Sequence, residues 1–180
     1  KSGERGVFNR AAAIRQCEKY DRDTGYDFGT NPCGEIILRP NQFCNLSEIV
    51  CRADDTVDTL AHKVEIATFI GTFQSCLTNY TYIRDEWAKN SKEERLLGVS
   101  MTGIMDCPLI NGLEGREERN EILTRLRSIA EDSNDYWSGQ FGIERSAAIT
   151  CVKPSGTVSQ LVDASSGIHS RYAENYIRRA

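Results

Sequence analysis

The most regular pattern of hydrophobic positions follows Thr56. Apolar side chains recur there every three or four residues over a long stretch without proline, which places them on one face of an α-helix. The pattern predicts a helix from Thr56 to Thr81 or Ile83. Its apolar positions are Val57, Leu60, Ala61, Val64, Ile66, Ala67, Phe69, Ile70, Phe73 and Leu77.

Two further stretches have helical spacing. Apolar positions from Val7 to about Asp21 predict a first helix, which a polar, glycine-containing exit at residues 21–25 ends. A second long helix is predicted from Glu114 to about Phe141, with charged residues of both signs on its solvated face. Its inward positions are Ile122, Leu123, Leu126, Ile129 and Ala130.

Short apolar runs between these helices predict buried strands. Residues 96–106 are apolar and punctuated by glycine, which indicates a strand that runs into a turn, and residues 147–152 form a similar run. Residues 35–38 predict a short strand, whereas residues 46–50 fit either a strand or the start of a helix. Residues 85–95 are charged enough to be a solvated connection. Strands separated by long helices indicate an α/β fold with parallel strands.

Composition limits the classes of function. The chain has 180 residues, of which 39% are hydrophobic and 27% charged, with a formal net charge of −4 and a pI near 5.3. These values are typical of a globular protein and argue against binding to a nucleic-acid polymer or an anionic membrane. No run approaches the roughly 20 apolar residues that cross a bilayer, so a cytoplasmic location is expected.

The cysteines argue against a disulfide scaffold. Seven cysteines at irregular intervals cannot all pair within the chain, and secreted domains built on disulfides have regular frameworks. A zinc site is not predicted either, because no C-x-x-C pair exists and His62 and His169 are far apart in the sequence. We therefore expect a few reactive thiols among small core cysteines.

The candidate chemistry centres on Asn31-Pro32-Cys33-Gly34-Glu35, where a thiol, a carboxylate and an amide lie within five residues. Pro32 fixes its own φ and Gly34 permits an unusual backbone, so a tight loop could direct the reactive side chains into one pocket. The structural alternative is a buried thiol beside an ordinary turn.

A second loop, Lys153-Pro154-Ser155-Gly156-Thr157-Val158-Ser159, follows a predicted strand and precedes a predicted helix. Hydroxyl groups and backbone donors at a helix N-terminus can bind phosphate. The spacing is not that of a Walker loop, and Ser or Thr at this place is more often only a helix cap.

The first and last residues of the sequence resemble the interior of a longer chain. The chain begins at Lys1 without a start methionine, and residues 176–180 end without a capping signal. We therefore expect residues 1–180 to be a fragment of a longer chain.

Three motifs in this order resemble the catalytic subunit of ribonucleotide reductases: N-P-C-G-E, then C-N-L-S-E, then K-P-S-G-T-V-S with S-S-G-I-H after it. The resemblance extends to the opening S-G-E-R-G-V-F-N-R and the closing Y-I-R-R. It implies that residues 1–180 are a single partial catalytic domain, which is part of a ten-stranded α/β barrel. The catalytic cysteine would lie on a finger loop that threads through the barrel centre.

The resemblance also implies residue roles. Cys33 would become a transient thiyl radical that removes the 3′ hydrogen of the ribose. Glu35 would be the base toward the 3′ hydroxyl and Asn31 would hold the sugar, because loss of the 2′ hydroxyl as water needs a group that manages the 3′-oxygen proton. Cys44 would belong to the redox-active cysteine pair that an external, thioredoxin-like dithiol resets, with its partner upstream of Lys1.

In the phosphate loop, the resemblance assigns substrate binding to Pro154, Ser155, Gly156 and Thr157. The five other cysteines match no redox position of the family and are expected to be structural. They are Cys17, Cys51, Cys76, Cys107 and Cys151.

The eleven-residue step from Cys33 to Cys44 resembles the adenosylcobalamin-dependent class, in particular its branch that reduces ribonucleoside triphosphates. This class would need adenosylcobalamin and, in the whole protein, an effector nucleotide. The di-iron or dimanganese class, which reduces diphosphates, is the alternative within the family.

Two alternatives lie outside the family's activity. A non-catalytic α/β domain would keep the loops without turnover, and a thiol-dependent transferase would use Cys33 as a two-electron nucleophile. A barrel built from only some of its strands leaves unpaired edges and apolar faces exposed. We therefore expect the isolated segment to fold poorly and to be inactive.

Overall fold

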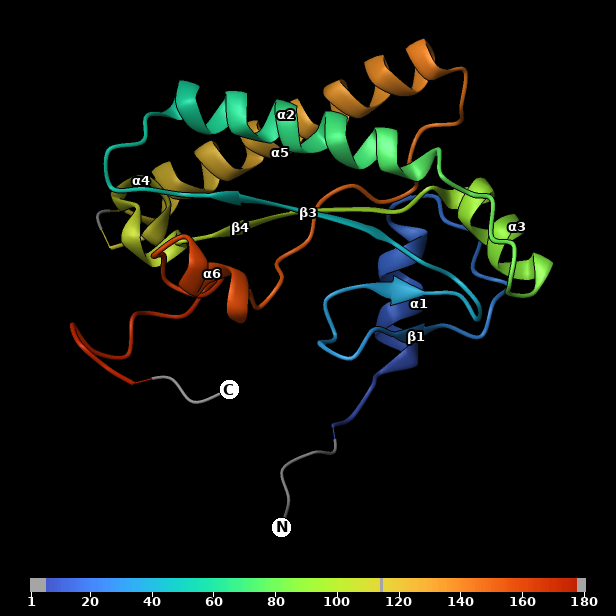
Figure 1. Cartoon of the computed structure of the whole chain (residues 1–180), viewed down its shortest axis with the longest axis horizontal. Helices are drawn as coiled ribbons and strands as arrows, with labels where there is room; N and C mark the ends of the chain where they lie inside the picture. The colour runs from blue at the N-terminus through green and yellow to red at the C-terminus, as the bar shows by residue number, and fades with distance from the viewer. Residues whose placement is uncertain (1–5, 114, 178–180) are drawn as a thin grey trace.

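The computed structural model describes residues 6–113 and 115–177. Within them a small parallel sheet lies at the centre, two long helices cover one face, and a hairpin, a short helix and the C-terminal loops lie on the other (Figure 1). Parts of the opening and closing motifs that carry the resemblance, residues 2–5 and 178–179, lie outside the described residues.

The central sheet is parallel, as predicted. Strand β3 (Asn45–Val50) pairs with β4 (Leu97–Thr102), with Asn45 opposite Leu97 and Val50 opposite Thr102. The open assignment of residues 46–50 is thereby settled as strand. Residues 147–152 were predicted as a strand. They instead run beside β4 as an extended segment, which pairs with β4 through a parallel bridge between Val99 and Thr150.

Helices α2 (Val57–Ser75) and α5 (Arg116–Phe141) form the layer above the sheet. Thr56 caps α2 by accepting a hydrogen bond from the Thr59 backbone, while the Thr59 hydroxyl accepts one from the Thr56 backbone. Both long helices were predicted from their apolar spacing. The core between them and the sheet includes Ile49, Leu60, Val64, Ala67, Leu97, Val99, Ile122, Leu126, Ala130 and Ile149.

The predicted end of α2 and the predicted connection after it are wrong. Helix α2 ends at Ser75, well before Thr81, because Leu77 and Tyr82 find no apolar surface and are 65% and 97% exposed. Residues 85–95, predicted as a solvated connection, form helix α3 (Asp85–Glu94) instead. The face that α3 buries is polar and is held by ion pairs, so hydrophobic periodicity does not detect it.

The lower layer contains helix α1 (Arg10–Glu18), shorter than the predicted 7–21, and an antiparallel hairpin. The hairpin consists of β1 (Gly29–Thr30) and β2 (Ile37–Leu38), so the strand predicted at 35–38 is present but shorter. Three short helices complete the structure: η1 (Ile104–Asp106), α4 (Pro108–Asn111) and α6 (Thr157–Leu161). Within the described part of the chain, no helix combines the length and apolarity that a bilayer crossing requires.

Candidate active site

The N-P-C-G-E motif forms the tip of the β1–β2 hairpin, which we call the thiol hairpin (residues 29–38). The Gly34 N–H donates to the Asn31 carbonyl over 3.0 Å, and Gly34 has a φ of +82°, which only glycine adopts without strain. The Asn31 side-chain oxygen accepts a hydrogen bond from the Ile36 N–H at 3.1 Å. This loop leaves Cys33 exposed at the tip.

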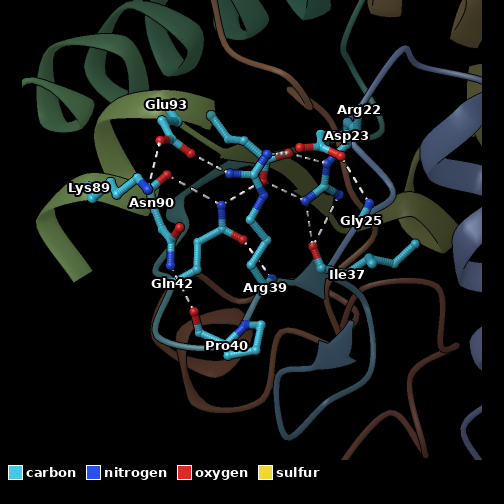
Figure 2. Close-up of polar contacts among 11 residues, drawn as sticks. Arg22, Asp23, Gly25, Ile37, Arg39, Pro40, Gln42, Lys89, Asn90 and Glu93 are labelled. Carbon is cyan, nitrogen blue, oxygen red and sulfur yellow. Dashed lines mark hydrogen bonds and ion pairs between the residues drawn. The ribbon is translucent and has the colours of Figure 1, made fainter. Parts of the chain in front are cut away.

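A buried polar cluster holds the base of the thiol hairpin (Figure 2). We call it the anchor cluster. Its centre is Glu94, at the end of α3, which accepts two hydrogen bonds from the Arg22 guanidinium at 2.8 and 3.0 Å. Both side chains are only 4% exposed. The same guanidinium donates two bonds of 3.1 Å to the Ile37 carbonyl in β2. The cluster is formed by Arg22, Arg39, Gln42, Asn90, Glu93 and Glu94.

The second arginine of the anchor cluster, Arg39, directly follows β2 and joins this end of the hairpin to the same helix. Arg39 lies 2.7 Å from Glu93 and 3.2 Å from Glu94, and Gln42 donates to Glu94 over 2.6 Å. Burial disfavours the charged form of Glu94, but the hydrogen bonds from Arg22 and Gln42 and the two arginine charges outweigh it, so its pKa is lowered. The hairpin base is therefore fixed by an ionised carboxylate.

Glu35, two residues after Cys33, has a different environment from the exposed thiol. Its side chain is only 5% exposed, and its Oε1 lies 3.5 Å from the ammonium of Lys153. Its other oxygen, Oε2, is buried and has no hydrogen-bond partner among the described residues. A buried carboxylate oxygen without a partner is available to a ligand that brings a donor.

The charge of Glu35 affects the pKa values of two nearby thiols, Cys44 and Cys151. Burial, and then the Glu35 charge, raise the pKa of Cys44 to about 11, while Lys153 acts in the opposite direction. The same causes raise the pKa of Cys151 to about 12, with Cys44 as a further contributor. Both side chains are therefore neutral thiols at physiological pH.

Gly98 provides the space for these groups. A Cβ at this position of β4 would lie 2.4 Å from a Leu46 methyl carbon, 3.1 Å from the Cys151 sulfur and 3.4 Å from an Ile36 methyl carbon. Side chains from the hairpin, β3 and the 147–152 segment thus converge over a single glycine. Sequence reasoning assigned Cys151 a structural role; the only signal for its position was that it precedes Lys153 by two residues.

The predicted phosphate loop lies against the same sheet. The Lys153 N–H donates to the Ser100 hydroxyl at 2.8 Å, and the Ser155 hydroxyl donates to Glu48 at 2.7 Å. Ser155 is buried, whereas Pro154, Gly156 and Thr157 are exposed. The Ser155 hydroxyl is therefore already engaged in an internal hydrogen bond to Glu48. The three exposed residues form the accessible part of the loop.

The structure thus brings Glu35, Cys44 and the phosphate loop together, and it carries Asn31 and Cys33 on the hairpin that contains Glu35. Of the cysteines expected to be structural, Cys17, Cys51 and Cys107 are buried in the core. Among the described residues there is no group of three or more His, Cys, Asp or Glu side chains that could hold a metal ion.

The chain is similar to adenosylcobalamin-dependent ribonucleoside-triphosphate reductases. It is 29% identical to that of Levilactobacillus brevis and 30% identical to that of Lacticaseibacillus paracasei, in each case over 99% of the chain. The chain spans 27% of the length of these relatives. No family model matches the sequence.

The fold is similar to a solved crystal structure of a B12-dependent (class II) ribonucleotide reductase. The TM-score is 0.66 at 26% sequence identity, over 80% of this chain and 23% of that one. The resemblance read from the motifs and the expected fold, part of the α/β barrel of this family, are therefore confirmed.

Proposed function

We propose that this chain, a relative of the adenosylcobalamin-dependent ribonucleotide reductases, carries the catalytic loop of an enzyme that reduces ribonucleoside triphosphates to 2′-deoxyribonucleotides. One observation carries the proposal. Glu35, two residues after the exposed Cys33, is paired with Lys153 of the predicted phosphate loop, although 118 residues separate Glu35 and Lys153 in sequence. A base for the ribose and a loop for the phosphates are thus parts of one site.

In the proposed reaction, Cys33 acts as a thiyl radical and takes the 3′ hydrogen atom of the ribose. Glu35 accepts the 3′-hydroxyl proton, and the 2′ hydroxyl leaves as water. A dithiol containing Cys44 then supplies two electrons and two protons and becomes a disulfide, while Cys33 returns a hydrogen atom to C3′. The balance is one ribonucleotide and one dithiol converted to one deoxyribonucleotide, one disulfide and one water.

The environments of the groups support these roles. Exposure of Cys33 at the hairpin tip lets it reach a substrate, and the free Oε2 of buried Glu35 can accept a proton. Cys44, with a pKa of about 11, is a thiol that retains its proton at neutral pH, as a donor of hydrogen must. Asn31 uses its side-chain oxygen within the loop, so its amide N–H groups are what it can offer to a sugar hydroxyl.

Phosphate binding is proposed for the loop from Lys153 to Thr157. The exposed residues Pro154, Gly156 and Thr157 form its accessible surface, and the Lys153 ammonium supplies positive charge. Ser155 would contribute its backbone and hold the loop in place through Glu48, because its hydroxyl is already donated.

Adenosylcobalamin is the cofactor that we propose. When bound, it supplies the radical that activates Cys33. Pro32, Cys33 and Gly34 are all exposed, so the hairpin tip fits contact with a bulky group. An external dithiol and an effector nucleotide are the other partners proposed for the whole protein, in the cytoplasm.

The test uses a full-length chain that contains this segment, supplied with adenosylcobalamin, a dithiol and a ribonucleoside triphosphate. Deoxyribonucleotide formation should be abolished by Cys33→Ser. Cys44→Ser should impair reduction but leave some cofactor cleavage, and Cys76→Ser, at the end of α2, is the matched control. Wild-type turnover in both site variants would show that the roles are wrong.

The same assay separates the alternatives. Turnover of diphosphates with a di-iron or dimanganese partner, and none with adenosylcobalamin, would favour the other class of the family. The absence of any turnover in the full-length chain would favour a non-catalytic domain.

A further inference from the structure

We propose that Lys153 is a positioning residue of this site: its ammonium holds one oxygen of the Glu35 carboxylate and leaves the other oxygen for the substrate. The inference rests on the proposed function, because it assumes that Glu35 acts on a bound ribonucleotide. It adds a second task to a residue that the motif places only in the phosphate loop.

The asymmetry of the Glu35 carboxylate is the main observation. Oε1 lies 3.5 Å from Lys153 Nζ, whereas Oε2 is buried and has no partner among the described residues. The Glu35 side chain is 5% exposed and that of Lys153 is 31% exposed. A buried carboxylate is costly unless a cation or donors compensate it, and the Lys153 ammonium is the cation that lies beside Oε1.

The main chain of Lys153 is held on two sides, which defines the point from which its side chain extends toward Glu35. Its N–H donates to the Ser100 hydroxyl in β4 at 2.8 Å. On the other side, Gly167 approaches so closely that a Cβ there would lie 2.7 Å from the Lys153 carbonyl oxygen, and its φ is +55°. Pro154 restricts the backbone further. The ammonium is therefore delivered from a defined point on the sheet.

The charges of Glu35 and Lys153 both affect the pKa values of the two neighbouring thiols, Cys44 and Cys151. For both Cys44 and Cys151, the Glu35 charge opposes ionisation of the thiol and the Lys153 charge favours it. Without the lysine, the carboxylate would stand among two neutral thiols and apolar side chains. Its orientation would then depend on the substrate alone.

Because Lys153 lies in the phosphate loop, the Lys153–Glu35 ion pair links phosphate binding to the orientation of the base. Lys153 is the first residue of the proposed phosphate loop and residues 154–157 complete it, so the triphosphate and the base are held by adjacent residues of one segment. A nucleotide bound on this loop would find Glu35 already oriented, which is the kind of preorganisation that accelerates a reaction after binding. Lys153 should therefore affect kcat more than KM.

The experiment compares Lys153→Met and Lys153→Arg in the full-length chain at saturating ribonucleoside triphosphate. We expect Lys153→Met to lower kcat by about 10- to 100-fold, as loss of orientation does, with only a few-fold rise in KM. Lys153→Arg keeps the charge and should recover kcat to within about tenfold of wild type. If Lys153→Met raises KM and leaves kcat unchanged, Lys153 is only a phosphate contact and the proposal is overturned.

A second measurement does not depend on turnover. Alkylation of Cys44 and Cys151 by iodoacetamide, followed by peptide mass spectrometry at one alkaline pH, should slow about three- to tenfold in Lys153→Met, because the thiolates lose a nearby cation. Lys153→Arg should restore the rates. Lys63→Met is the matched control and should leave both rates unchanged. Lys63, in α2, pairs with Asp55 at 2.6 Å and donates to the Val50 carbonyl, at the end of β3 opposite to Cys44.

The two measurements separate the possible failures. If the wild-type chain makes no deoxyribonucleotide, the proposed function fails and the positioning role fails with it. If turnover is normal in wild type but alkylation is the same in Lys153→Met, the ion pair does not act on this cluster and only the further inference is overturned.

Discussion

The tip and the base of the thiol hairpin are only a few residues apart and differ in almost every physical property. At the tip, Pro32, Cys33 and Gly34 are exposed. At the base, Arg22, Arg39 and Glu94 are buried and joined by ion pairs of 2.8 and 3.2 Å. A reactive thiol needs access, and it also needs a defined position, so the two properties are divided between the two ends.

The base uses charge where hydrophobic packing would have served for stability alone. Buried ion pairs recover the cost of desolvation only with good geometry, and apolar replacements are often as stable. What the anchor cluster provides is direction, because the two-fold hydrogen bonding of Arg22 to Glu94 and of the same guanidinium to Ile37 permits one arrangement of β2 against α3.

The largest expected effect is at the tip. Cys33→Ser should lower turnover of the full-length enzyme by at least about 10⁴-fold, equivalent to about 5 kcal/mol of activation free energy, because a hydroxyl cannot replace the thiyl radical. Its free energy of unfolding should change by less than about 0.5 kcal/mol, since the side chain is exposed. A large loss of stability together with the loss of turnover would contradict this division between tip and base.

At the base, Glu94→Gln should destabilise the domain by about 3–5 kcal/mol in urea unfolding, because it leaves two buried guanidinium groups without their shared anion. Glu93→Gln is the matched control: its side chain is 39% exposed, so it should cost at most about 1 kcal/mol. Equal effects of the two variants would mean that the buried pair has no special role.

The same pair of variants gives a pH dependence. The lowered pKa of Glu94 means that its contribution to stability is present above its unfolded pKa, about 4.3, and is lost as the pH falls through the folded value. The stability difference between wild type and Glu94→Gln should therefore shrink on acidification below about pH 4.

The rate of alkylation should differ between Cys33, at the exposed tip, and Cys44, near Glu35. Cys44, with a pKa of about 11, has about one thiolate in a thousand at pH 8, and burial restricts access as well. We expect iodoacetamide to modify exposed Cys33 at least about 100-fold faster, and the rate at Cys44 to rise about tenfold per pH unit up to pH 10. Equal rates at pH 8 would show that Cys44 is not shielded.

The smallest effect concerns the space between the hairpin and the sheet. Gly98→Ala should cost about 1–3 kcal/mol, because its methyl group would meet the Leu46 side chain at 2.4 Å and the Cys151 sulfur at 3.1 Å. Combining it with Leu46→Ala should recover part of this loss in thermal unfolding. No recovery would place the strain elsewhere.

Much of the upper layer could be predicted from the sequence. The apolar spacing after Thr56 and that of Ile122, Leu126 and Ala130 predicted α2 and α5, because each helix buries a regular apolar face. The glycine-punctuated run at residues 96–106 predicted β4. The spacing did not predict where α2 ends, since periodicity continues past Ser75 without a surface to cover.

The candidate site was predictable only as separate pieces. The residue types marked the Asn31–Glu35 loop and the Lys153–Ser159 loop, and their order identified the family. Helix α3 was missed because its buried residues, Asn90, Ser91 and Glu94, are polar.

The sequence by itself determined the two long amphipathic helices, the parallel arrangement of the strands and the motifs that carry the chemistry. Only the tertiary structure decided that Glu94 binds Arg22, which lies 72 residues before it and holds the hairpin, and that Lys153 meets Glu35 across 118 residues. The physical reason is that a helix or a turn is stabilised by interactions between residues that are close in sequence, so a local pattern can predict it. A buried ion pair depends on two distant segments meeting, and neither segment contains a local pattern that records its partner.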